Sequence, residues 1–127
     1  MNYLLDTCAF IWTAEGGPLS PSAVDAITSA GNDLFLSAAS CWEIATKFSL
    51  GRLPLSGPPE RVVVDAREKH GILPLGIDEE SALRSGRLPW LHRDPFDRLL
   101  ISQALTHDLT ILTPDPLIGQ YGVKTRW

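Results

Sequence analysis

Three carboxylates stand where predicted strands of an α/β sheet end or lead into a helix. Asp6 directly follows the apolar run Tyr3–Leu5, and Asp115 lies two residues beyond Thr113, where another apolar run ends. Ligands of open α/β sheets bind outside the carboxyl ends of the strands, so both side chains should emerge at the same edge. Glu43 lies early in the helix expected after a further strand, within roughly two helical turns of that edge. The spacing therefore predicts an acidic cluster at one edge of a sheet.

A fourth carboxylate, Asp97, lies near the beginning of a helix expected from Pro95 to about His107. It shares its helix face with apolar side chains, namely Leu100, Ile101 and Ala104. A carboxylate at the head of a core-facing stripe needs a partner because bare burial is very costly, and a metal ion is one such partner. This helix leads into the strand expected at residues 110–113. Simple connectivity then predicts that it begins at the opposite sheet edge, unless a long helix brings Asp97 inward.

Together, these acids point to chemistry that depends on divalent metal ions. Carboxylates gathered at one place repel one another unless cations fill the space between them. Mg²⁺ and Mn²⁺ prefer oxygen ligands. Two such ions about 3.5–4 Å apart can activate a water and stabilise the leaving oxygen in phosphodiester cleavage. The hydroxyls of Thr7 and Thr113 either orient a carboxylate or a water, or cap turns.

Helix capping is the competing explanation for most of these acids. Asp94 and Asp115 each precede a proline, as an N-cap residue does, and Asp97 would then lie in a first turn, where the helix dipole favours an acid. Glu43 fits a capping box or a solvated helix face. Asp6 alone closes a buried strand without an evident structural purpose, so there we favour a functional role.

Composition sets the broad class of the protein. The chain has 127 residues, 44% hydrophobic and 20% charged, as expected for one globular domain over residues 1–127. A net charge of −4 counts against simple coating of nucleic acid, but not against a nuclease whose carboxylates hold cations. Cys8 and Cys41 are too few for a disulfide framework. The beginning of the chain lacks a signal peptide and no apolar run suits a membrane, so we expect a cytoplasmic protein.

Short apolar runs alternate with helical patterns along the chain. Strands are expected at residues 3–5, 34–36, 72–73 and 110–113, with an edge strand at Val123. Capping residues, prolines and glycines predict helices from 21 to before 31, 38 to about 50, 60 to about 70, 78 to about 85 and 95 to about 107. This alternation predicts an α/β fold with a central, mostly parallel sheet.

Four stretches resemble, in order, the motifs of the PIN-domain family. Leu4-Leu5-Asp6-Thr7 resembles the opening motif, and residues 37–53 (SAASCWEIATKFSLGRL) resemble the second motif of VapC-type toxins, with Glu43 as its acid. Residues 92–104 (HRDPFDRLLISQA) resemble the third, with Asp97 at the acidic position and Asp94 as an extra acid. Residues 112–115 (LTPD) resemble the fourth, which ends at Asp115.

The resemblance implies a fold, an activity and partners. The fold is a central parallel sheet with helices on both faces, which brings Asp97 beside the other acids at one cleft. The activity is that of an endoribonuclease using one or two Mg²⁺ or Mn²⁺ ions, in a toxin of a type II toxin–antitoxin system. The partners are an RNA substrate, a cognate VapB-like antitoxin that wraps the toxin and blocks its site, and a second copy in a homodimer.

Basic and aromatic side chains are candidates for contact with RNA. Phosphates could be bound by Lys47, Arg52, Arg93 and Arg98, whose ordinary role is solubility, and bases could stack on tryptophans. We expect His92 to be structural rather than catalytic.

Three other classes of protein compete with this interpretation. A haloacid-dehalogenase-type phosphotransferase needs a second aspartate at the position of Cys8, and a receiver domain needs one where Ser37 ends a strand. Both fit poorly. A catalytically inactive PIN module that binds RNA or protein stays open, and the RNA target cannot be read from the sequence.

Overall fold

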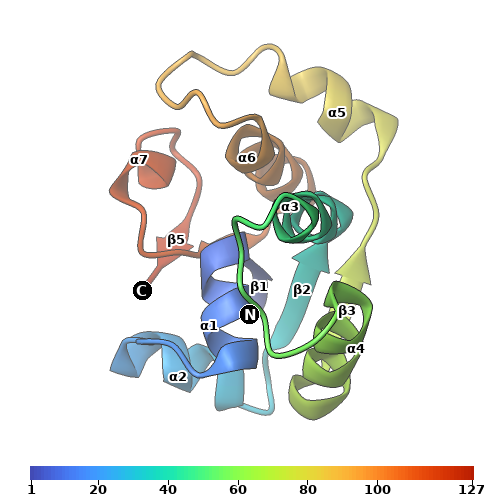
Figure 1. Ribbon diagram of the computed structural model, residues 1–127. Helices are drawn as coiled ribbons and strands as arrows, with labels where there is room; N and C mark the ends of the chain where they lie inside the picture. Colours follow the sequence, from blue (N-terminus) through green and yellow to red (C-terminus); the bar gives the residue numbers. More distant parts are fainter.

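The computed structural model describes residues 1–127 and has one five-stranded, all-parallel sheet at its centre, in the order β3-β2-β1-β4-β5 (Figure 1). The strands are β1 (Asn2–Leu5), β2 (Asp33–Ser37), β3 (Ile72–Leu75), β4 (Thr110–Leu112) and β5 (Thr125–Arg126). The helices are α1 (Thr7–Glu15), α2 (Pro21–Thr28), α3 (Ala38–Ser49), α4 (Pro59–His70), α5 (Glu79–Ser85), α6 (Pro95–His107) and α7 (Pro116–Gly119). The predicted α/β fold with a parallel sheet is confirmed.

Local signals account for most of the helix boundaries. The hydroxyl of Ser20 accepts a hydrogen bond from the N–H of Ala23 at 3.0 Å, and Pro21 is the first residue of α2. Ser37 caps α3 in the same way through the N–H of Ala39. Gly71 ends α4 with a φ of 65°, in the left-handed region that glycine adopts without strain.

Three segments differ from the sequence-based expectations, and one of them is the short helix α7, which was not expected although Asp115 before Pro116 had the pattern of an N-cap. Helix α1 begins directly after Asp6 and was not predicted, because no proline and no first-turn acid marks its beginning. The edge strand lies at Thr125–Arg126 rather than at Val123, whose side chain instead packs in the core under α6. The edge strand begins later than expected because a turn that includes Gly122, with a φ of 75°, precedes it.

Alternate residues of the strands face two separate hydrophobic clusters. Tyr3 and Leu5 of β1 belong to the cluster that α1, α2 and α4 cover, whereas Leu4 belongs to the cluster under α6 and α7. Helix α3 contributes to both clusters, through Ala39 and Ile44. The sheet is thus buried on both faces, as parallel sheets generally are. No helix is long and apolar enough to cross a membrane.

Four helices begin at the carboxyl edge of the sheet. Helices α1, α3 and α7 follow β1, β2 and β4 within a few residues, and α6 runs back toward the start of β4. A helix that leads into a parallel strand runs antiparallel to it, so α6 also begins at the carboxyl edge. The expectation from connectivity that this helix begins at the opposite edge is therefore wrong, because it ignored this reversal of direction, and Asp97 lies beside the other acids, as the resemblance implied.

We expect Leu4→Ala to lower the free energy of unfolding by about 2–5 kcal/mol, because Leu4 is fully buried between the sheet and α6. Urea denaturation measures the loss. Leu83→Ala, at an exposed position of α5, is the matched control and should change it by less than about 0.5 kcal/mol. Equal effects of the two variants would contradict this description of the core.

Candidate metal centre

Asp6 joins β1, α1 and β4 through its two carboxylate oxygens. Oδ1 accepts the backbone N–H of Ala9 at 2.7 Å and so caps α1, and Oδ2 accepts the hydroxyl of Thr113 at 2.5 Å. The side chain is buried. The expectation that Asp6 has little structural purpose is wrong, because the unpredicted helix α1 gives it a capping role. Thr113 orients a carboxylate, which is one of the two roles expected for it.

Asp115 lies beside Asp6 and Thr113, just after the end of β4. Its backbone N–H donates to the hydroxyl of Thr113 at 3.0 Å, and its Oδ1 accepts the N–H of Leu117 at 2.9 Å, which caps α7. Because β1 and β4 are hydrogen-bonded neighbours, Asp6 and Asp115 emerge side by side, as the strand-end spacing predicted. Capping engages only one of the two Asp115 oxygens.

Glu43 is buried in α3 and faces the same edge. Its Oε1 accepts the hydroxyl of Thr7 at 2.7 Å, and its Oε2 lies 2.5 Å from the ammonium of Lys47. At 5% exposure Glu43 is not a solvated helix acid. It does not form a capping box with Ser40 either, because the N-cap of α3 is Ser37. The hydrogen bond from Lys47 raises the pKa of that ammonium group.

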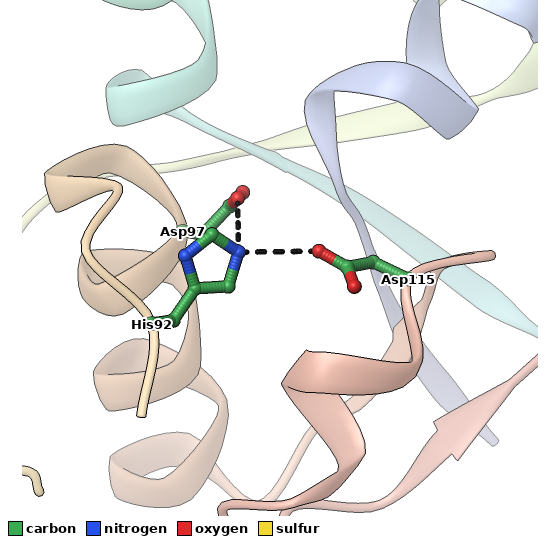
Figure 2. A group of neighbouring side chains, drawn as sticks. All are labelled: His92, Asp97 and Asp115. Atoms are coloured by element: carbon green, nitrogen blue, oxygen red, sulfur yellow. Dashed lines mark hydrogen bonds and ion pairs between the residues drawn. The ribbon is translucent and has the colours of Figure 1, made fainter. Parts of the chain in front are cut away.

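The beginning of α6 contributes two more acids. Asp94 is the N-cap, and its Oδ1 accepts the N–H of Phe96 at 2.9 Å, as the capping explanation predicted. Asp97 lies in the first turn, and its Oδ2 is 3.1 Å from Nε2 of His92. The same nitrogen is 3.1 Å from Oδ2 of Asp115, so the imidazole lies between carboxylates from two elements, as Figure 2 shows.

The carboxylates act on one another electrostatically. Burial, more than any other cause, raises the pKa of Asp6 to about 6, and the charges of Asp115 and Glu43 add to this effect. Burial likewise raises the pKa of Asp97 to about 7, with further contributions from Asp94, Asp6 and Glu43 that His92 partly offsets. Burial and then the charges of Asp6, Asp97 and Glu43 raise the pKa of the Cys8 thiol to about 11. These side chains therefore form one negative cluster.

The cluster suits a hard divalent cation. Its carboxylate oxygens are the ligands that Mg²⁺ and Mn²⁺ prefer. Asp97 and Asp115 each place a carboxylate oxygen within 4.8 Å of the other and of a ring nitrogen of His92, so the two carboxylates are close enough to share one ion. A bound cation would also reverse the effect of burial on Asp6 and Asp97, because it favours the ionised form of a carboxylate.

His92 was expected to be structural rather than catalytic, and the structure places its imidazole inside the cluster. Its place at the head of the third motif was the only sequence signal for this position. The contacts that hold it there come from Tyr121 and Asp94.

The structure removes Arg98 from the candidate RNA contacts. Arg98 is 3% exposed, and its guanidinium group donates to three backbone carbonyls, those of Ser85, Leu88 and Pro89. The prediction was wrong because it took a basic residue near the beginning of a helix to be a surface residue. Lys47, Arg52 and Arg93 are exposed.

Asp97→Asn should stabilise the protein at neutral pH when divalent ions are absent. The pKa of Asp97 is about 7 in the folded protein against 3.8 for a free side chain, so the folded protein binds this proton more tightly. The free energy of unfolding therefore falls as the pH rises between these values. We expect Asp97→Asn to add about 1–2 kcal/mol at pH 8 and less at pH 5, by urea denaturation in EDTA.

The matched control for this prediction is Asp65→Asn on α4, whose side chain is 60% exposed and should show no such pH dependence. A loss of stability for Asp97→Asn at pH 8 would mean that the ionised carboxylate is a net stabiliser, contrary to the geometry described above.

Known proteins resemble this chain in sequence and in fold. The family model described as PIN domain matches residues 3–123. Ribonuclease VapC16 of Mycobacterium tuberculosis is 36% identical over 81 residues, and the alignment covers 57% of this chain and 57% of that relative. The chain therefore spans little more than half the length of the curated relative that it matches.

Solved structures share the fold at low sequence identity. VapBC2 from Rickettsia felis, bound to a DNA fragment from its promoter, superposes with a TM-score of 0.76 at 13% identity, covering 99% of this chain and 98% of that chain. FitAcB from Neisseria gonorrhoeae superposes with a TM-score of 0.65 at 22% identity, covering 97% and 95%. The family model spans nearly the whole chain and the architecture agrees with it, so the chain belongs to the PIN-domain family.

Proposed function

We propose that this protein is a VapC-like toxin, an endoribonuclease that uses Mg²⁺ or Mn²⁺ to cleave cellular RNA. The observation that carries the proposal is the cluster of buried and half-buried carboxylates at one edge of the sheet, in which burial and mutual repulsion raise the pKa of Asp6 and Asp97. Membership of the PIN-domain family and the likeness to a relative named ribonuclease support it.

Each acidic residue has a defined part in the proposed reaction. Asp6, Glu43, Asp97 and Asp115 would hold one or two divalent ions, with Asp94 as a further candidate ligand. Such ions supply an activated water and stabilise the leaving oxygen in phosphodiester hydrolysis. Thr113 and Thr7 donate hydrogen bonds that fix Asp6 and Glu43 in orientation.

Lys47 lies where its positive charge can interact with a phosphate of the substrate. Its ammonium group is held by Glu43 at the side of the cluster, so it can contact a phosphate next to the scissile bond. Arg52 and Arg93 are exposed and could contact further phosphates of the RNA.

A cavity beside Glu43 has room for an RNA base. It has a volume of about 280 Å³, and Thr7, Cys8, Ile11, Trp12, Glu43, Lys47 and Leu53 line it. Trp12 gives it an aromatic wall, and aromatic side chains stack on unpaired bases of single-stranded RNA. This combination of a base-sized cavity and an acidic cluster favours RNA over a small phosphorylated substrate.

We further propose a VapB-like antitoxin and a second copy of this chain as partners. The structural neighbours from Rickettsia felis and Salmonella typhimurium are complexes named VapBC, each bound to DNA. An antitoxin that covers the carboxylate cluster would keep RNA away from it. The cytoplasmic location expected from the sequence stays a prediction.

The purified protein, free of any antitoxin, should cleave RNA with Mn²⁺ or Mg²⁺ and not with EDTA. We expect Asp6→Asn to lower the cleavage rate at least about 100-fold, because it removes a carboxylate from the centre of the cluster. Gel analysis of several RNA classes, including transfer, ribosomal and messenger RNA, gives the rates. Asp65→Asn on the surface of α4 is the matched control and should cleave as the wild type does.

Cleavage that survives EDTA, or that Asp6→Asn does not reduce, would refute the metal-dependent nuclease. Absence of cleavage with every RNA class would favour the alternative function, a catalytically inactive PIN module that binds RNA or protein.

Expression of the chain alone in a bacterial host should arrest growth, because no antitoxin is present to cover the site. Asp6→Asn should restore growth at the same protein level, measured by immunoblot. A variant that accumulates equally and remains equally toxic would show that toxicity does not come from the carboxylate cluster.

A further inference from the structure

His92 reaches the carboxylate cluster from the segment that joins α5 to α6. Its side chain is 14% exposed, and its Nε2 atom lies 3.1 Å from both Asp97 and Asp115 (Figure 2). Its other ring nitrogen, Nδ1, accepts the backbone N–H of Asp94 at 3.2 Å. The imidazole is therefore held at both nitrogens.

The contact at Nδ1 decides what Nε2 can do. Because Nδ1 presents its lone pair to the N–H of Asp94, a neutral ring carries its proton on Nε2. Nε2 is then a hydrogen-bond donor to Asp115, with the carboxylate of Asp97 at 3.1 Å beside it, and it has no lone pair to offer a metal ion. Carboxylates that ligate metals are commonly oriented by donors of this kind, which do not touch the metal themselves.

The backbone of His92 is held by a second set of contacts. Its N–H donates to the hydroxyl of Tyr121 at 2.7 Å, and the same hydroxyl accepts a bond from Arg98 at 3.3 Å. Arg98 also donates to three carbonyls from the end of α5 to Pro89, and its guanidinium carbon lies 3.6 Å from the ring centre of Trp90. A buried arginine and one tyrosine hydroxyl thus fix the segment that delivers the imidazole.

We propose that Tyr121 and Arg98 are positioning residues, which hold His92 so that its Nε2–H orients Asp115 toward the metal ion and lies against Asp97. This inference rests on the proposed metal-dependent function. It places His92 outside the metal ligands, as a donor to the ligating carboxylate of Asp115 and a close neighbour of Asp97.

Tyr121→Phe tests the proposal because it removes only the hydroxyl that holds His92. Tyr3→Phe is the matched control: it also removes a tyrosine hydroxyl that accepts a bond from an arginine, here Arg126 at 2.6 Å, away from the cluster. Titration calorimetry with Mn²⁺ should show affinity about 10-fold weaker for Tyr121→Phe and within about 2-fold of wild type for Tyr3→Phe.

Spectroscopy separates a positioning role from ligation. ¹⁵N NMR of the metal-free wild type at pH 8 should show His92 with its proton on Nε2, and Tyr121→Phe should move this spectrum toward an average of both tautomers. In Mn²⁺-loaded protein, pulsed EPR should show no nitrogen coupling from a directly bound imidazole. His92→Gln, which keeps an N–H donor, should bind Mn²⁺ more tightly than His92→Ala.

The outcomes separate this inference from the proposed function. Equal Mn²⁺ affinity of Tyr121→Phe, Tyr3→Phe and the wild type would overturn the positioning role and leave the metal site standing. A proton on Nδ1, or a strong imidazole coupling in the EPR spectrum, would overturn the assignment of His92 as a donor. If the wild type binds no Mn²⁺, the proposed metal site fails, and the metal-free NMR comparison alone then decides whether Tyr121 positions His92.

Discussion

Burial of several carboxylates at one edge of the sheet is the constraint on which the rest of the structure depends. Asp6 and Asp115 follow adjacent strands, and Glu43 and Asp97 come in from helices that begin at the same edge. Hydroxyl and N–H donors satisfy some of their oxygens, yet burial still raises the pKa to about 6 for Asp6 and about 7 for Asp97. A full set of ionised carboxylates at this place needs cations between them.

The same side chains serve folding and the proposed chemistry. Asp6, Asp94 and Asp115 each cap a helix through Oδ1. This leaves Oδ2 of Asp6 to Thr113 and Oδ2 of Asp115 to His92. Capping and metal binding, which compete as explanations when only the sequence is known, are therefore compatible. Capping also fixes these three carboxylates relative to a helix before any ion binds.

Sequence patterns predicted the sheet and most helices because buried apolar runs, capping residues and helix-ending glycines act over a few residues. They were less informative where distant contacts decide the outcome. Helix α1 carries no local starting signal except Asp6 itself, and Arg98 is buried only because carbonyls of a remote turn gather around it. His92 enters the cluster through Tyr121, 29 positions away in sequence. The acids themselves were predictable, since each stands beside a strand end or a helix beginning.

A crystal structure of the protein soaked in Mn²⁺, with anomalous diffraction data, tests the metal centre most directly. We predict an anomalous peak at the carboxyl edge of the sheet, within ligand distance of Asp6 and Asp97, and loss of that peak in Asp97→Asn. The imidazole of His92 should remain outside the ligands and bonded to a ligating carboxylate. An ion bound elsewhere, or no peak at a concentration of Mn²⁺ that supports RNA cleavage, would contradict the assignment of this cluster as the metal site.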